Sequence, residues 1–142
     1  MKMRHCFLYT FLSVLLLLSL AGCGHKALPE NVAIKDLDSQ LFTQQELMDA
    51  VQLLYDDWNP NEWGELQSVQ YLGDDVSQRE LDYCNNLPHK RADFTQCAVF
   101  RVQFHTPAQG TITLNPDYDY TWTWTFARTD HSPWKTISYG AA

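Results

Sequence analysis

Positive charge is scarce in this sequence: ten lysines and arginines stand against 17 aspartates and glutamates, which gives a formal net charge of −7. A domain that binds nucleic acid carries a basic stripe or patch, because it must neutralise phosphates. The composition provides no such stripe, so nucleic acid is excluded as a partner. Adhesion to an anionic lipid surface through a basic patch is excluded for the same reason.

Catalytic signatures are also missing. The sequence contains no G-x-S-x-G elbow, no H-E-x-x-H pair and no glycine-rich phosphate loop. Asp117 and Asp119 would point together from a turn, but they lack the ligand number and the glycine of a calcium loop. His131 lies between Asp130 and Ser132, and adjacent residues do not build a catalytic relay. We therefore assign no catalytic residue and expect no metal and no cofactor.

A hydrophobic run long enough to cross a membrane is absent as well. The apolar stretch over residues 7–20 has 14 residues, whereas a spanning helix needs about 20. It follows a short basic start that contains Lys2 and Arg4, an arrangement typical of an export signal. The stretch runs into Leu20-Ala21-Gly22-Cys23.

These four residues resemble the lipobox of bacterial lipoproteins, and all four positions match. In that family the cysteine thiol receives a diacylglycerol, and the signal is cut immediately before it. The resemblance implies a signal peptide over residues 1–22 and a lipidated Cys23 that anchors the protein in the cell envelope, on the extracytoplasmic face of a membrane. Acyl chains anchor at about 0.8 kcal/mol per buried methylene. An ordinary cleaved signal with a chance cysteine is the alternative, and the choice between an inner and an outer membrane stays open.

Cysteine usage agrees with export. Of the four cysteines, Cys6 would leave with the signal and Cys23 would carry lipid. Cys84 and Cys97 remain, and two cysteines outside the cytoplasm favour a disulfide. That bond would stabilise the fold by about 3 kcal/mol on the chain-entropy model. A metal site is the weaker alternative, because too few further ligands lie near the two cysteines in the sequence.

The clearest helix signal begins at Thr43. Thr43 and Glu46 have the spacing of a capping box, and apolar residues then recur along one helical stripe as far as Trp58. A segment with Pro and Gly ends that helix. A second box, Ser77 with Glu80, predicts a shorter helix that carries one of the two remaining cysteines.

Strands are predicted over residues 65–72, 97–105, 118–127 and 134–140. Consecutive strands joined by short turns make an antiparallel meander. We therefore predict a single α+β domain over residues 42–142, in which one long N-terminal amphipathic helix packs on a curved antiparallel sheet of about four strands. Residues 23–41, with mixed Gly, Pro and charge, are interpreted as the lipidated N-terminus and a tether, and residues 32–37 within them could add a short edge strand.

The end of the chain carries a second resemblance. The last part of the chain has an aromatic strand, an arginine and a polar turn, and a new strand then begins at Pro-Trp-Lys. The residues that carry this pattern are Trp124, Arg128, Pro133, Trp134 and Lys135. With the long helix, this tail resembles the last hairpin of cystatin-like and nuclear-transport-factor-like domains. The resemblance covers about residues 42–140 and is structural, because such domains include enzymes, carriers and proteins that act by association.

The stretch over residues 117–126 poses the main functional question, because an aromatic ring occupies every second position from Tyr118 to Phe126. The rings could stack on a sugar, or they could be the buried face of a strand. Five large rings each bury roughly 150 to 250 Å², and the threonines between them suit an exposed β surface. We interpret the rings as core.

A third interpretation combines the two: most of the rings form core, and some of them line a pocket between helix and sheet. Its candidate residues are His105, Arg101, Trp122 and Trp124. The favoured function is a membrane-anchored, non-enzymatic domain that binds a protein partner, an envelope component or a small ligand. The fold resemblance also suggests a homodimer through the open sheet face. The alternative is a small-pocket enzyme or a ligand carrier in which His105 and Arg101 act on the ligand.

Overall fold

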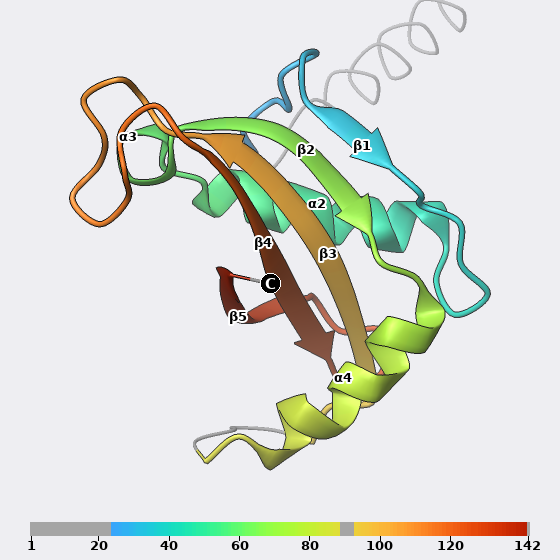
Figure 1. Ribbon diagram of the computed structural model, residues 1–142. Helices are drawn as coiled ribbons and strands as arrows, with labels where there is room; N and C mark the ends of the chain where they lie inside the picture. The colour runs from blue at the N-terminus through green and yellow to red at the C-terminus, as the bar shows by residue number, and fades with distance from the viewer. Residues whose placement is uncertain (1–23, 89–92, 142) are drawn as a thin grey trace, which may run out of the picture.

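The computed structural model describes residues 24–88 and 93–141 (Figure 1). The predicted signal peptide, Cys23 and positions 89–92 lie outside the described residues. Within them the chain forms three helices and five strands, so the prediction of an α+β domain is confirmed. In chain order the elements are β1 (Ala33–Lys35), α2 (Gln44–Asp57), α3 (Pro60–Trp63), β2 (Glu65–Tyr71), α4 (Asp74–Asn86), β3 (Gln96–His105), β4 (Asp119–Arg128) and β5 (Lys135–Ala141).

The finer prediction, a single long helix on an antiparallel sheet of about four strands, is wrong in two respects. Helix α4 has 13 residues and nearly matches the 14 residues of α2. The sheet in the described chain has five strands and is mixed, because β1 pairs in parallel with β2. Strand β1 has three residues and lies at the sheet edge, within residues 32–37, where a short edge strand was left open beside the tether interpretation. So short a strand gives almost no periodic signal in the sequence.

The strands lie in the order β1-β2-β3-β4-β5, so β2 to β5 form an antiparallel meander. Helix α2 crosses one face of this sheet, and α4 lies against one end of the other face (Figure 1). The pairing shifts register between Leu66 and Ser68 and again between Thr125 and Phe126. Such irregularities bend a strand, which suits the curvature of the sheet around α2.

Helix α2 begins as its capping box predicts. The Thr43 Oγ1 accepts a hydrogen bond from the Glu46 N–H at 3.2 Å, and the Glu46 carboxylate accepts one from the Thr43 N–H at 2.9 Å. The buried stripe of the helix consists of Leu47, Ala50, Val51 and Leu54. It shares one apolar cluster with Phe100, Phe104 and Phe126 of β3 and β4, all fully buried. The helix therefore packs its apolar stripe on the sheet, as predicted.

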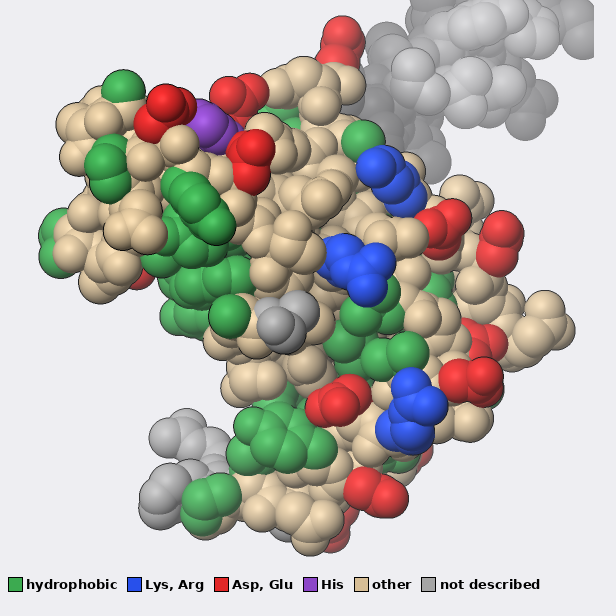
Figure 2. Space-filling view, in the orientation of Figure 1, with side chains coloured by type: hydrophobic (Ala, Val, Ile, Leu, Met, Phe, Trp, Pro, Cys, Tyr) green, Lys and Arg blue, Asp and Glu red, His purple; other side chains and the backbone are tan. Residues whose placement is uncertain are grey.

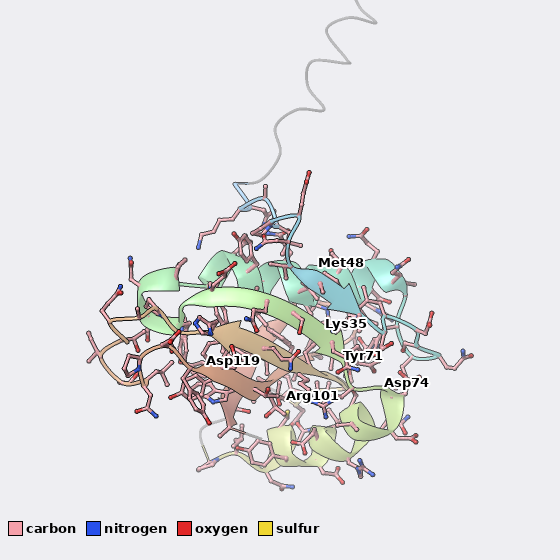
Figure 3. The ribbon with its side chains drawn as sticks, turned by 45° about the horizontal axis from the view of Figure 1, so that its top comes forward. Lys35, Met48, Tyr71, Asp74, Arg101 and Asp119 are labelled. Atoms are coloured by element: carbon pink, nitrogen blue, oxygen red, sulfur yellow. The ribbon has the colours of Figure 1, made fainter. Side chains whose placement is uncertain are left out.

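Helix α4 begins three residues before its predicted capping box, so that prediction is wrong. It starts at Asp74, whose carboxylate accepts hydrogen bonds from the Ser39 Oγ at 2.5 Å and the Tyr71 hydroxyl at 2.9 Å (Figure 3). Ser77 lies inside the helix and is buried, and its Oγ accepts a hydrogen bond from the Val99 N–H at 3.2 Å. Contacts from distant parts of the chain therefore override the local capping pattern.

The first described residues are fastened to the C-terminal end of α2. The His25 Nδ1 lies 2.5 Å from a carboxylate oxygen of Asp56, and the Lys26 N–H donates to the other oxygen at 2.9 Å. The Lys26 ammonium reaches the backbone carbonyls of Asp56 and Trp58 at 2.6 and 3.2 Å. Carbonyls at the C-terminus of a helix attract cations. We call His25 and Lys26, with these contacts, the N-terminal strap.

The part of the second sheet face beyond α4 is polar. Arg101 and Gln103 of β3 and Thr121 of β4 are exposed there, and the Arg101 guanidinium donates to the Gln70 side-chain oxygen at 3.2 Å. Within residues 24–88 and 93–141, no helix is both long and apolar enough to cross a membrane.

Candidate functional site

The aromatic stripe of β4 is divided between core and surface. Phe126 is fully buried and Trp124 is 5% exposed, whereas Tyr118 just before the strand is 53% exposed. Tyr120 and Trp122 between them are half-buried. The buried half belongs to the cluster that includes the apolar stripe of α2. The interpretation of the rings as core therefore holds for the half beside α2, and the other half is available to line a surface site.

Further rings gather beside the partly exposed half. Trp63 of α3 meets Trp122, Trp124 and Tyr139 at centroid distances of 5.4, 5.7 and 5.2 Å with nearly perpendicular planes. Trp124 and Tyr139 stack at 4.7 Å. Edge-to-face and offset-stacked pairs are the favoured geometries of aromatic side chains. These rings therefore already make favourable aromatic contacts with one another. The aromatic groove beside them, of about 310 Å³, is lined by Leu54, Asp57, Trp58, Glu62, Trp63, Trp124, Thr136 and Tyr139.

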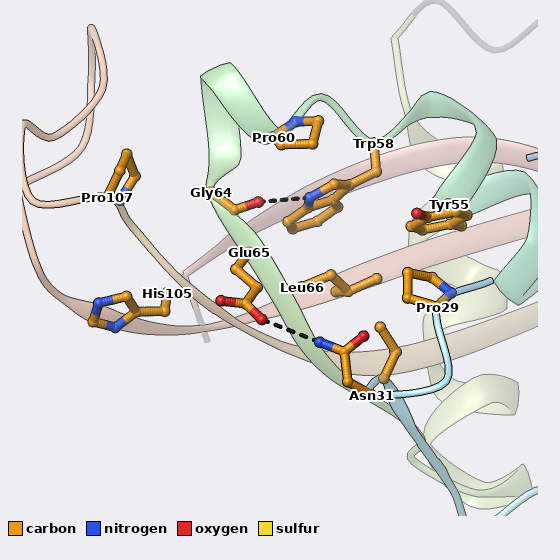
Figure 4. A pocket seen from close by; sticks show the side chains of 11 residues that line it. Pro29, Asn31, Tyr55, Trp58, Pro60, Gly64, Glu65, Leu66, His105 and Pro107 are labelled. Carbon is orange, nitrogen blue, oxygen red and sulfur yellow. Dashed lines mark hydrogen bonds between the residues drawn. The ribbon is translucent and has the colours of Figure 1, made fainter. Parts of the chain in front are cut away.

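A second hollow, also lined by Trp58, has a volume of about 340 Å³ (Figure 4). We call it the proline-rimmed pocket. It is lined by Pro29, Asn31, Val32, Tyr55, Trp58, Pro60, Gly64, Glu65, Leu66, His105 and Pro107. These side chains come from separate stretches of the chain, and most of the wall is apolar. A volume of 300 to 1,000 Å³ with few polar groups is typical of small-molecule sites.

Gly64 and Trp58 give this pocket its shape. Gly64 has a φ of 91°, and a Cβ on it would lie 2.1 Å from the backbone oxygen of His105. Glycine alone allows this approach, which brings the chain before β2 against the end of β3. The Trp58 indole N–H donates to the Gly64 carbonyl at 2.9 Å (Figure 4). The bond holds the indole as the wall between the pocket and the aromatic groove.

His105 lies at the rim of the pocket between two carboxylates. Its Nδ1 is 2.7 Å from Asp119 and its Nε2 is 3.1 Å from Asp117. The bond with Asp119, helped by the bond with Asp117, raises the pKa of His105 and favours the imidazolium form. Glu65, also on the rim, accepts a hydrogen bond from the Asn31 amide at 3.1 Å. Figure 2 shows a histidine with acidic side chains beside it and hydrophobic side chains gathered over the same end of the molecule.

The four predicted pocket residues do not meet in one place. His105 lines the proline-rimmed pocket, and Trp124 lines the aromatic groove. Trp122 contacts Trp63 beside that groove. Arg101 pairs with Thr123 in the sheet, so it projects from the face opposite the tryptophans. The alternation along each strand already implies that Arg101 and the two tryptophans lie on opposite faces of the sheet.

A polar cluster at the other end of α2 was not predicted by any sequence pattern. The Arg128 guanidinium is 5% exposed and bonds to the Glu46 carboxylate, and it lies 4.2 Å from the centre of the Trp134 ring. The His131 Nδ1 approaches the same carboxylate at 3.0 Å. The Thr43 N–H, Arg128 and His131 together lower the pKa of Glu46 to about 2. This cluster borders a hollow of about 680 Å³ along the outer face of α2. Each charge in it has a partner, as a structural ion pair requires.

Comparisons with protein-family models, with curated proteins and with solved structures found no match for this chain. The site must therefore be judged by its own chemistry. Within the described residues, no group of three or more His, Cys, Asp or Glu side chains is placed to hold a metal ion.

The cysteine pair is the last predicted site in the described chain. Cys84 of α4 and Cys97 of β3 face each other with 3.8 Å between their sulfurs, and both are thiols. The contact with the Cys97 thiol lowers the pKa of Cys84. The predicted disulfide is not formed here and stays a proposal.

Proposed function

We propose that this protein is a lipid-anchored, extracytoplasmic binding domain, and that its ligand enters the proline-rimmed pocket. One observation carries the proposal: a largely apolar hollow of about 340 Å³ is built from separate stretches of the chain and framed by a few fixed polar groups. Such a combination is the usual form of a ligand site. The cystatin-like and nuclear-transport-factor-like resemblance belongs to the same proposal, and the helix laid across the meander supports it.

Binding is favoured over catalysis because of the state of His105. A general base needs a free lone pair within reach of its substrate. Both ring nitrogens of His105 already lie within hydrogen-bond distance of a carboxylate. Arg101, its predicted partner in an enzyme, projects from the exposed polar face of the sheet.

The rim also indicates the charge of the ligand. Glu65 lies on the rim, and Asp117 and Asp119 flank His105, so carboxylates outnumber basic groups there. An anionic head group would meet net repulsion, whereas a cationic one would be attracted. We propose a ligand with an apolar body and an amine-type head group, such as a short alkylammonium or the side chain of a basic peptide.

Titration with octylammonium and with octanoate tests this ligand class, because the two share a chain length and differ in charge. Octylammonium should shift the NMR resonance of the Trp58 indole N–H and bind at least about tenfold more tightly than octanoate, a difference of about 1.4 kcal/mol. The Pro107→Trp variant, which fills the mouth of the pocket, should abolish the shift. Ala108→Trp, one residue further on and exposed, is the matched control. Equal affinity for both compounds, or an unchanged Pro107→Trp variant, would contradict the proposal.

The anchor has its own test at Cys23. Cys23→Ala should leave the signal uncut or release the protein from the membrane fraction. Unchanged processing and retention would remove the lipoprotein part of the proposal and leave the pocket untouched. A homodimer through the polar sheet face is also proposed, and the mass of the purified protein in solution tests it.

A further inference from the structure

Helix α4 and strand β3 bring two buried sulfurs into contact. Cys84 is fully buried and Cys97 is 3% exposed, and their sulfur atoms are 3.8 Å apart. The two side chains project toward each other from a helix and from the sheet face that the helix covers. They sit in a small apolar cluster with Phe94, Val99 and Ala127.

The chain around the two cysteines is already held in place. The Asn85 amide donates to the Phe94 carbonyl at 2.9 Å, and the Asn85 side-chain oxygen accepts from the Phe94 N–H at 2.9 Å. This reciprocal pair closes the loop between α4 and β3 one residue beyond Cys84. At the start of the helix, the Ser77 hydroxyl bonds to the N–H of Val99. The backbones that carry the two thiols are therefore fixed relative to each other.

We propose that Cys84 and Cys97 are an oxidation site, and that a disulfide between them fastens the C-terminal end of α4 to β3. A disulfide needs the sulfurs at about 2.05 Å, so they must approach by a little under 2 Å. The proposal requires rotation of the two side chains to supply that movement, because both backbones are held in place. In one respect the inference rests on the proposed function, since a disulfide persists only where the compartment is oxidising.

The oxidant is a disulfide-bearing protein or small molecule. One cysteine thiolate attacks a sulfur of that disulfide, forming a mixed disulfide and expelling one thiolate of the oxidant. The second cysteine thiolate then attacks the sulfur of the first, and the other thiolate of the oxidant leaves. Two thiols of this protein lose two electrons and two protons, and the oxidant gains them as two thiols. Both thiols are buried in the folded state, and the hollow of about 190 Å³ that Cys97 borders with Leu41, Ser77 and Gln78 marks the side from which the oxidant would approach.

The expected consequence is a change in the stability of the domain. A covalent link restricts the unfolded chain more than the folded one. For a loop of this length, reduction should raise the unfolding equilibrium constant by about 150-fold. The loss should be felt first at α4, where the apolar cluster is small.

The sequence allows the bond to be detected directly. Trypsin cleaves after Lys90 and Arg91, between the two cysteines, so a disulfide would join a peptide from Glu80–Lys90 to one from Ala92–Arg101. The full chain, exported and purified without reductant, should yield this linked pair by mass spectrometry. Dithiothreitol should separate it. Cys84→Ser and Cys97→Ser should each eliminate the link, and dithiothreitol should lower the urea midpoint of the wild type but not that of either variant.

A second arm separates this inference from the proposed function. The purified wild type is reduced, freed of dithiothreitol and exposed to oxidised glutathione while folded. Formation of the same linked pair supports the inference wherever the protein resides in the cell. Stable mixed disulfides with glutathione at both cysteines, or two thiols that stay alkylatable after unfolding, would overturn it. Closure in this arm together with free thiols in the protein purified from cells without reductant would instead count against the extracytoplasmic location.

Discussion

The two faces of the sheet are covered in different ways. On the α2 side, 17 buried residues of the described chain form one cluster that includes Phe100, Phe104 and Trp124. On the α4 side, five buried residues form the second cluster. Apolar burial stabilises by roughly 25 cal/mol per Å², so the first face has ample hydrophobic support. The second depends more on individual polar contacts, such as those of Ser77 and Asn85 with the chain of β3 and the turn before it. The proposed disulfide between Cys84 and Cys97 would therefore stabilise the side of the sheet that buries least apolar surface.

The largest loss of stability should come from truncating a buried side chain on the α2 side of the sheet. Phe100 and Val99 are neighbours on β3 that point to opposite faces, and both are buried. Phe100→Ala should lower the free energy of unfolding by about 4 kcal/mol, as is usual for a fully buried phenylalanine. Val99→Ala, its matched control on the α4 side, should cost about 2 kcal/mol. Urea titration followed by circular dichroism measures both, and equal losses would break the comparison between the faces.

An intermediate effect is expected at the polar contact under α4. Ser77→Ala keeps the helix but removes the acceptor of the buried Val99 N–H. An unpartnered buried donor costs about 1 to 3 kcal/mol. The control is Gln78→Ala, at the next position of the same helix, where the side chain is exposed. The measurement is amide hydrogen exchange of α4, which should quicken in Ser77→Ala. Exchange as slow as in Gln78→Ala would show that the hydroxyl does not hold the helix.

The last effect concerns Glu46 at the start of α2, and it is complete at neutral pH and shrinks as the pH falls. Its folded-state pKa is about 2, below the ordinary value of 4.5. A depressed carboxyl pKa gives stability that is complete above the unfolded value and is lost as the pH falls through the folded value. Glu46→Gln should therefore flatten the decline in melting temperature between pH 4.5 and pH 2. Asp49→Asn, at an exposed carboxylate of the same helix, should leave the decline as steep as in the wild type.

Local sequence signals predicted the parts of the fold that depend on neighbouring residues. The capping box at Thr43 marks the true start of α2, and the alternation from residue 97 onward marks β3. The start of α4 was mispredicted because Asp74 binds Ser39 and Tyr71, and the first of these lies 35 positions away. A pattern that spans three or four residues carries no information about such a contact.

The candidate site was predictable only in fragments. His105 was named from its place at the end of a strand, and it does line the pocket. The other candidates, Arg101 and the two tryptophans, do not join it. The pocket itself depends on prolines from separate stretches of the chain and on the close approach of Gly64 to the backbone of His105. That approach joins residues far apart in the sequence, and periodicity along one strand cannot report it.

The N-terminal strap has a mechanical consequence. A force applied at the first described residues passes through His25 and Lys26 into Asp56 before it reaches β1. Strand β1 has only three residues and would peel easily from the sheet edge. The strap therefore delivers tension to the end of a 14-residue helix packed on the main core. The load is therefore carried by α2 and not by the short strand β1.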